Sequence, residues 1–191
     1  KSTAVGADAL SAQNFATSTD THNTAVGYQA GVSVSTGVSN TLIGSQSGDA
    51  LTTGGYNVAV GHLALSTEDT SNNNTAVGYA ALMTLNGGTQ NVAVGQSAAA
   101  AMTTGNQNTI IGTNAGDALT DADGNVALGT LALTSDTLGS DSIAIGNNAL
   151  SSQNFTTATS SYNVAIGKNA GLDITTGLRN NLFGAFAGDS L

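Results

Sequence analysis

The sequence contains no cysteine, no proline and no tryptophan, and only 8% of its 191 residues are charged. Without cysteine the chain has neither disulfide bonds nor a thiolate metal site, and nothing marks its redox compartment. Only three residues are basic, too few to neutralise a phosphate backbone, so the composition argues against a nucleic-acid partner. No apolar run approaches the ~20 residues that span a bilayer, and Lys1 does not open a signal peptide. We therefore expect a soluble segment whose net charge of −9 suits an extracellular surface.

Glycine, by contrast, is abundant, and eleven of the 25 glycines mark a repeat. Each of the eleven follows a large apolar residue, and successive markers are 17 residues apart except for two steps of 21. The marker glycines are Gly6, Gly27, Gly44, Gly61, Gly78, Gly95, Gly112, Gly129, Gly146, Gly167 and Gly184. Such regular self-similarity predicts a solenoid.

Each repeat begins with Asn in most cases, then Thr or Val, Ala, Val or Ile, and the marker glycine. A short run rich in β-branched residues that ends in a turn former predicts a strand. The competing interpretation is a 34-residue helical repeat, which requires apolar residues at i, i+3, i+4 and i+7 and few glycines. Because Thr, Asn and Gly dominate, we expect an all-β parallel β-solenoid of about eleven coils of 17 residues.

A longer period lies above the first. Residues 48–51 (GDAL) recur four repeats later as residues 116–119, and residues 9–15 of the first 21-residue repeat match residues 149–155 of the second. We therefore interpret residues 1–191 as a single repetitive segment without linker or second domain, and expect it to belong to a longer fibre. At ~4.8 Å per coil, eleven coils make a rod on the order of 50 Å long.

Alternation along the strand assigns each position to a face. The large residue before each glycine is expected inside the coil, together with the Thr or Val two positions earlier. The residue between them faces the other way and is never polar. Because a strand that is apolar on both faces is normally covered on both, we expect this second face to be an interchain contact in a homotrimer. The predicted trimer contact consists of Ala25, Ala59, Ala76, Ala93, Ala127 and Ala144. The alternative is a tolerated alanine stripe on the surface.

The recurring Asn has two interpretations. Stacked amides bond from coil to coil and stabilise turns, whereas a functional ladder would bind a sugar or a metal. Nine occurrences in eleven repeats favour the structural interpretation.

The two 21-residue repeats carry the candidate ligand-facing loops, with Asn14 and Phe15 in one and Asn154 and Phe155 in the other. An aromatic ring beside amides can bind a sugar if it is exposed. The alternative is that each Phe folds back and plugs a locally wider coil.

Residues 23–31 (NTAVGYQAG) and 141–149 (DSIAIGNNA) resemble the head repeats of YadA-like trimeric autotransporter adhesins and similar repeats of phage tail fibres. The resemblance implies a left-handed β-roll, three chains side by side, and attachment to a host surface through a glycan or a protein. The repeats here are longer than is typical of the adhesin heads, and residues 1–191 include no segment that resembles their stalk and membrane anchor or the chaperone domain of a tail fibre. The owner therefore stays open between a phage and a bacterium.

The function expected from these features is a structural and adhesive segment of a trimeric extracellular fibre. The alternative is a filament subunit that polymerises end to end, because an uncapped solenoid exposes strand edges. Ice binding would need a Thr-x-Thr array in every coil, which the sequence lacks.

We expect no enzyme, cofactor or metal, because no catalytic set converges on one repeat. The adjacent acidic pair Glu68 and Asp69 is interpreted as a solvated turn rather than part of a depolymerase. Residues 121–125 (DADGN) lack the later Glu of a calcium loop.

Overall fold

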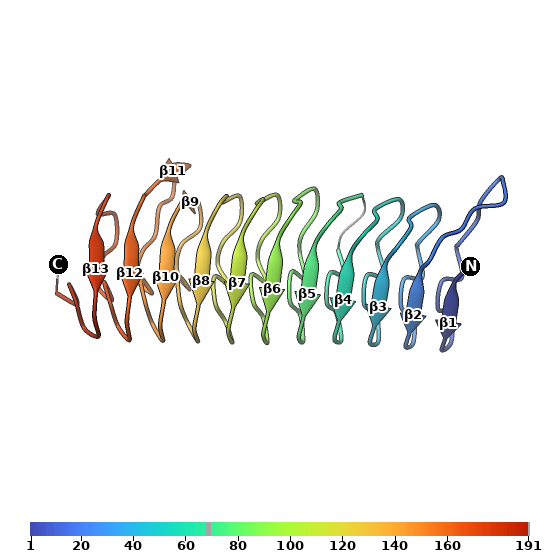
Figure 1. The fold of residues 1–191 in the computed structure, drawn as a ribbon, viewed down its shortest axis with the longest axis horizontal. Coiled ribbons are helices and arrows are strands. Elements are labelled where there is room, and N and C mark those ends of the chain that lie inside the picture. The colour runs from blue at the N-terminus through green and yellow to red at the C-terminus, as the bar shows by residue number, and fades with distance from the viewer. Residues whose placement is uncertain (68–69, 191) are drawn as a thin grey trace.

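The computed structural model describes residues 1–67 and 70–190 and shows an elongated rod of stacked coils, with the two chain ends at opposite ends of the rod (Figure 1). One three-residue strand per coil contributes to a single 11-stranded parallel sheet that follows the rod. No helix occurs among these residues. The predicted all-β parallel β-solenoid is confirmed.

The strands of the main sheet are β1 (Thr3–Val5), β2 (Thr24–Val26), β3 (Thr41–Ile43), β4 (Val58–Val60), β5 (Thr75–Val77), β6 (Val92–Val94), β7 (Thr109–Ile111), β8 (Val126–Leu128), β10 (Ile143–Ile145), β12 (Val164–Ile166) and β13 (Asn181–Phe183). Two shorter strands, β9 (Gly139–Ser140) and β11 (Thr159–Ser160), pair with each other where the second long coil leaves the rod.

The strands pair in register, so equivalent repeat positions stack in columns along the rod. Thr41 pairs with Val58 and Ile43 with Val60, both steps of one repeat. The marker glycines form such a column at the corner after each strand. Gly78 has a φ of +135°, and a Cβ built on it would lie 2.4 Å from the carbonyl oxygen of Gly95 in the next coil. Only glycine satisfies both the conformation and the space at this corner.

The structure corrects the predicted faces of the strand. The middle residue of each strand points into the coil, and Ala25, Ala59, Ala76, Ala93, Ala127 and Ala144 are fully buried within their own chain. They cannot be the trimer contact, nor a surface stripe. The large residue before each glycine, predicted inside, lies outside: Val26 is 37% exposed and Leu128 is 43% exposed.

The reason for the inversion is that the coil interior is narrow. It takes at most one large side chain from two positions, the middle of the strand and the position four residues after the marker glycine. In the coil of β4 the small Ala59 on the strand occurs with the large Leu65, whereas in the coil of β3 the large Leu42 occurs with Gly48. A Cβ on Gly48 would lie 2.8 Å from Cδ2 of Leu42, so the two positions compensate each other in size.

The Asn column closes most of the coils. Asn91 is buried and donates from Nδ2 to the carbonyl oxygen of Gly105, near the end of the same coil, at 2.7 Å. Its Oδ1 accepts from the backbone N–H of Asn108 in the next coil at 3.0 Å. Eight Asn side chains make the bond to their own coil: Asn23, Asn40, Asn57, Asn74, Asn91, Asn108, Asn125 and Asn163. The structural interpretation of this column is confirmed.

Replacing Asn91 with Ala should destabilise the rod by about 2–4 kcal/mol, because it leaves a buried carbonyl and a buried N–H without partners. Urea unfolding of N91A measures the change. The matched control is Thr113→Ala, since Thr113 is exposed and its hydroxyl makes no bond within the described chain. Equal unfolding midpoints for the two variants would show that the ladder does not hold the coils together.

Candidate functional site

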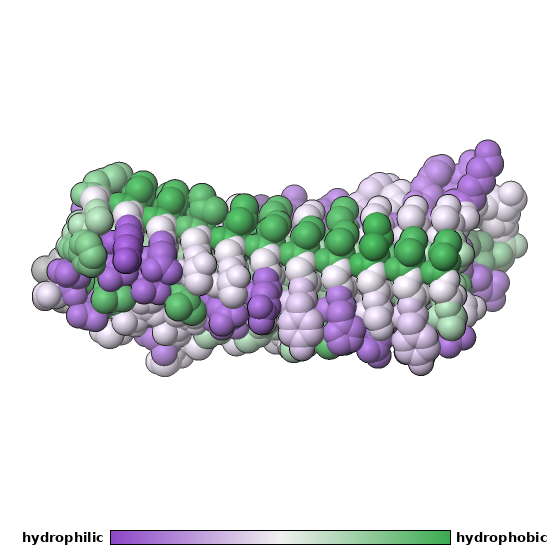
Figure 2. Space-filling view, turned by 90° about the horizontal axis from the view of Figure 1, so that it is seen from below, coloured by the Kyte–Doolittle hydropathy of each residue, from purple (hydrophilic) through white to green (hydrophobic). Residues whose placement is uncertain are grey.

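The outward face of the main sheet is an unbroken apolar row. We call it the apolar stripe, and it consists of Val5, Val26, Ile43, Val60, Val77, Val94, Ile111, Leu128, Ile145, Ile166 and Phe183. Figure 2 shows it as a continuous band along the length of the rod. A second row, mostly Thr and Val two residues earlier on each strand, lies on the same outward face. A continuous apolar surface of this length is unusual for a monomer and typical of an interaction site.

The second long coil holds its extra residues with a buried polar network. Asp136 is fully buried, and its carboxylate accepts from the backbone N–H of Gly139 at 3.1 Å and of Phe155 at 3.0 Å. Gln153, also fully buried, donates from Nε2 to Asp136 at 2.6 Å and to Ser142 Oγ at 2.8 Å. The network fixes the point where the loop starts.

Gln153 replaces the ladder amide that this coil lacks. The ladder position holds Ser142, whose hydroxyl cannot reach across the coil as Asn does. Gln153 Oε1 instead accepts from Asn163 Nδ2 at 2.8 Å, and so reconnects the ladder to the following coil. Sequence reasoning missed this pair, although the signal was visible: Ser2 with Gln13 in the first long repeat matches Ser142 with Gln153 in the second.

The candidate loop residues are placed as follows. Phe155 is only 6% exposed, which favours the plug over the sugar platform. Asn154 is half-buried and accepts from Thr137 Oγ1 at 3.2 Å. In the first long coil Phe15 is half-buried and Asn14 is exposed, while the neighbouring Gln13 Nε2 is buried without a hydrogen-bond partner. The two loops lie near opposite ends of the rod and form no common site (Figure 1).

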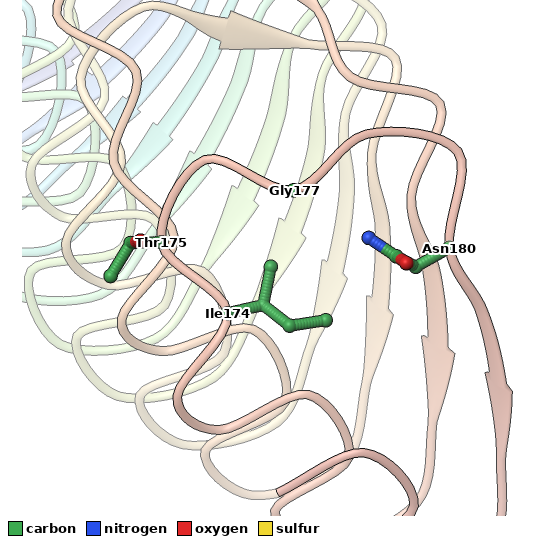
Figure 3. A pocket seen from close by; sticks show the side chains of 4 residues that line it. All are labelled: Ile174, Thr175, Gly177 and Asn180. Atoms are coloured by element: carbon green, nitrogen blue, oxygen red, sulfur yellow. The ribbon is translucent and has the colours of Figure 1, made fainter. Parts of the chain in front are cut away.

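A cavity of about 320 Å³ opens at the C-terminal end of the rod. Figure 3 shows Ile174 and Asn180 on its two sides with Gly177 between them. In the preceding coil the same space is closed by Asn163, which donates to the Gly177 carbonyl at 2.6 Å. The cavity is thus the open end of the coil interior rather than a separately built site.

Asp123, in the segment 121–125 that resembles part of a calcium loop, has a structural role. Its carboxylate accepts from the backbone N–H of Asn106 at 2.7 Å, so it caps the neighbouring turn. Among the described residues no three His, Cys, Asp or Glu side chains gather as a metal site would require, and no helix is suited to crossing a membrane. Glu68 and Asp69 lie outside the described residues.

Comparisons with known proteins add no relative: no family model, no curated protein and no solved structure matches the chain. What the chain does must therefore be inferred from its own surface.

Phe155→Ser should lower the free energy of unfolding by about 3–5 kcal/mol, because it removes a buried ring and leaves a cavity. The matched control is Tyr162→Ser, which truncates a ring that is 53% exposed. Urea denaturation followed by circular dichroism measures both. A Phe155→Ser variant as stable as the control would show that the ring is not part of the core.

Asp49 supplies a pH-dependent test. Its Oδ1 is buried without a partner, and burial raises the pKa of this carboxyl above its ordinary value of 3.8, partly offset by the backbone N–H groups of Asp49 and Ala50. A raised pKa means that the folded chain disfavours the ionised form, so stability is lost as the pH rises through that pKa. Asp49→Asn should therefore raise the melting temperature near pH 7, and the gain should disappear on acidification.

Asp117→Asn is the control for this experiment, because Thr134 Oγ1 donates to the Asp117 carboxylate at 2.5 Å. It should not raise the melting temperature. A gain for Asp49→Asn that stayed constant with pH would contradict the assignment to ionisation.

Proposed function

We propose that this chain is a structural and adhesive segment of a trimeric extracellular fibre, of the kind found in phage tail fibres and bacterial surface adhesins. The observation that carries the proposal is the apolar stripe on the outward face of the sheet. The interface proposed here consists of the residues before the marker glycines, in place of the alanines that the sequence pattern suggested.

The stripe calls for a partner because its apolar residues form one contiguous patch along the rod, and the largest contiguous patch of a protein is often an interaction site. Eleven strands about 4.8 Å apart and two side-chain rows about 7 Å apart give a face of several hundred Å². Burial of apolar surface contributes roughly 25 cal/mol per Å², so covering this face stabilises an assembly substantially. The exposed residues at both ends of the stripe, Val5 at 57% and Phe183 at 67%, show that it runs the full length of the rod.

A second and third copy of the same chain fit this face best. Any partner along the whole stripe must match its coil-to-coil period, and a parallel copy has that period by construction. Three copies around one axis bring equivalent rows together at every level, which is closed cyclic symmetry. The likeness of residues 23–31 to adhesin head repeats supports three copies rather than two.

The rest of the surface supports an adhesive or spacing role outside the cell. It consists largely of Thr, Ser, Asn and Gln, with few charges and no cysteine. Such a rod displays hydroxyl and amide groups at regular intervals, which suits attachment to a host-surface glycan or protein.

The second candidate is a filament in which chains join end to end. Its support is that β1 and β13 are the edge strands of the sheet, and unpaired strand edges accept further strands. Such an assembly has no fixed size, in contrast to a trimer.

The mass in solution tests the proposal. Light scattering should give three times the chain mass of 18.6 kDa for the wild type. Val77→Arg places a charge in the middle of the stripe and should give a monomer, because an unpaired charge is costly to bury. The control is Thr104→Arg, an exposed position outside the stripe, which should keep the trimer.

A wild type that is a monomer or a dimer would contradict the trimer. Polymers of indefinite size would favour the filament. A trimer that survives Val77→Arg would show that the stripe is not the interface.

A further inference from the structure

A trench of about 470 Å³ crosses the coils of β5, β6 and β7 on the side of the rod that follows the marker glycines. Its lining includes Met83, Gln96, Ala100, Ala101, Asn114 and Asp117. It includes no residue of the apolar stripe, although Gln96 borders the stripe, and it lies away from the long coils.

The trench exists because one coil is unusually small at its surface. Residues 97–101 (SAAAA) follow β6, and the column of Ala100 holds the larger Met83 in the preceding coil and Asp117 in the following coil. The column that holds Ala100 holds Val32 and Leu172 elsewhere in the chain. The missing side-chain volume opens the surface between Met83 of one neighbouring coil and Asp117 of the other.

The lining of the trench is partly apolar and partly polar. Met83, Ala100 and Ala101 are its apolar residues. The side-chain amides of Gln96 and Asn114 make no hydrogen bond within the described chain, so both can donate to and accept from a ligand. Asp117 is held by the bond from Thr134 to its Oδ1, which leaves Oδ2 as an acceptor.

Two aromatic rings stand beside the trench. His62 and Tyr79 stack with ring centroids 5.7 Å apart and an interplanar angle of 29°. Tyr79 is 52% exposed and occupies the same column as Gln96, one coil earlier. Its carbonyl oxygen accepts from the N–H of Ser97 at 2.8 Å, so the main chain of Tyr79 lies beside that of Ser97, which lines the trench. Figure 2 shows a row of mixed polar and weakly polar side chains along one border of the apolar stripe.

We propose that the trench and the ring pair bind a neutral oligosaccharide. One sugar ring would lie with its apolar face on Tyr79, and the next would place its hydroxyl groups against Gln96, Asn114 and Asp117. This assignment rests on the proposed adhesive function and gives it a place on the rod.

The charge of the molecule decides between neutral and acidic glycans. A sulfated or carboxylated sugar would meet Asp117 on a chain of net charge −9, and no basic residue lines the trench. A neutral sugar meets no such repulsion, and its hydroxyl groups supply the donors that a carboxylate oxygen requires.

Binding to immobilised maltohexaose, cellohexaose, mannohexaose and chitohexaose, with heparin as the acidic probe, tests the proposal. The wild type should bind at least one neutral hexasaccharide and not heparin. Ala100→Leu should fill the trench and weaken binding at least tenfold, and the fold should accept it because Leu172 occupies the same column. The matched control is Ser151→Leu in that column of another coil, which should bind like the wild type.

Tyr79→Ser should also weaken binding, whereas Tyr162→Ser, on an equally exposed ring elsewhere, should not. Absence of binding to every neutral probe, binding to heparin alone, or equal affinity of Ala100→Leu and Ser151→Leu would overturn the proposal. Light scattering of the same samples separates the two proposals: a trimer that binds no sugar defeats only the trench, and a single chain that binds sugar defeats only the trimer.

Discussion

The side-chain amide of the Asn column is the interaction on which the rest of the fold depends. Each amide joins the start of a coil to the end of the same coil and accepts a hydrogen bond from the next, as Asn91 does with Gly105 and Asn108. The coil is therefore closed at a fixed size, and its successor is placed in register. Where the column is interrupted by Ser142, the buried Gln153 restores the connection.

A coil closed at that size has a narrow interior. The volume of this interior limits which side chains can point inward. The middle residue of the strand is small where the residue four positions after the marker glycine is large, as in Ala76 with Leu82. The next residue, Val77, lies on the outward face. The β-branched or larger apolar residue before each marker glycine lies on the outward face, where these residues form the apolar stripe. The same size limit explains the period of four coils, because Leu42 and Ile110 on the strand are matched by Gly48 and Gly116.

Much of the architecture could be predicted from the sequence, because repeat length and glycine spacing report directly on coil geometry. The parallel solenoid, the role of the glycine corner and the structural role of Asn were all predicted. The orientation of the strand was not, because alternation shows that two faces differ but not which one is inside. The compensation between Ala59 with Leu65 and Leu42 with Gly48 carries that information, since only residues that share one interior need to balance their volumes. The trench left no comparable signal, because it arises from the absence of side chains around Ala100 in a single coil.

The central claim joins an observation to the proposal: the middle residue of the strand faces its own coil, and we propose that the residue before the marker glycine faces other chains. The absence of cysteine allows a direct test with single-cysteine variants and a short bis-maleimide crosslinker. Val77→Cys should give covalently linked pairs of chains on a denaturing gel, because equivalent residues would meet around the axis of the proposed trimer. Ala76→Cys should give none, because it lies inside the coil. Linked pairs from Ala76→Cys and none from Val77→Cys would contradict the account.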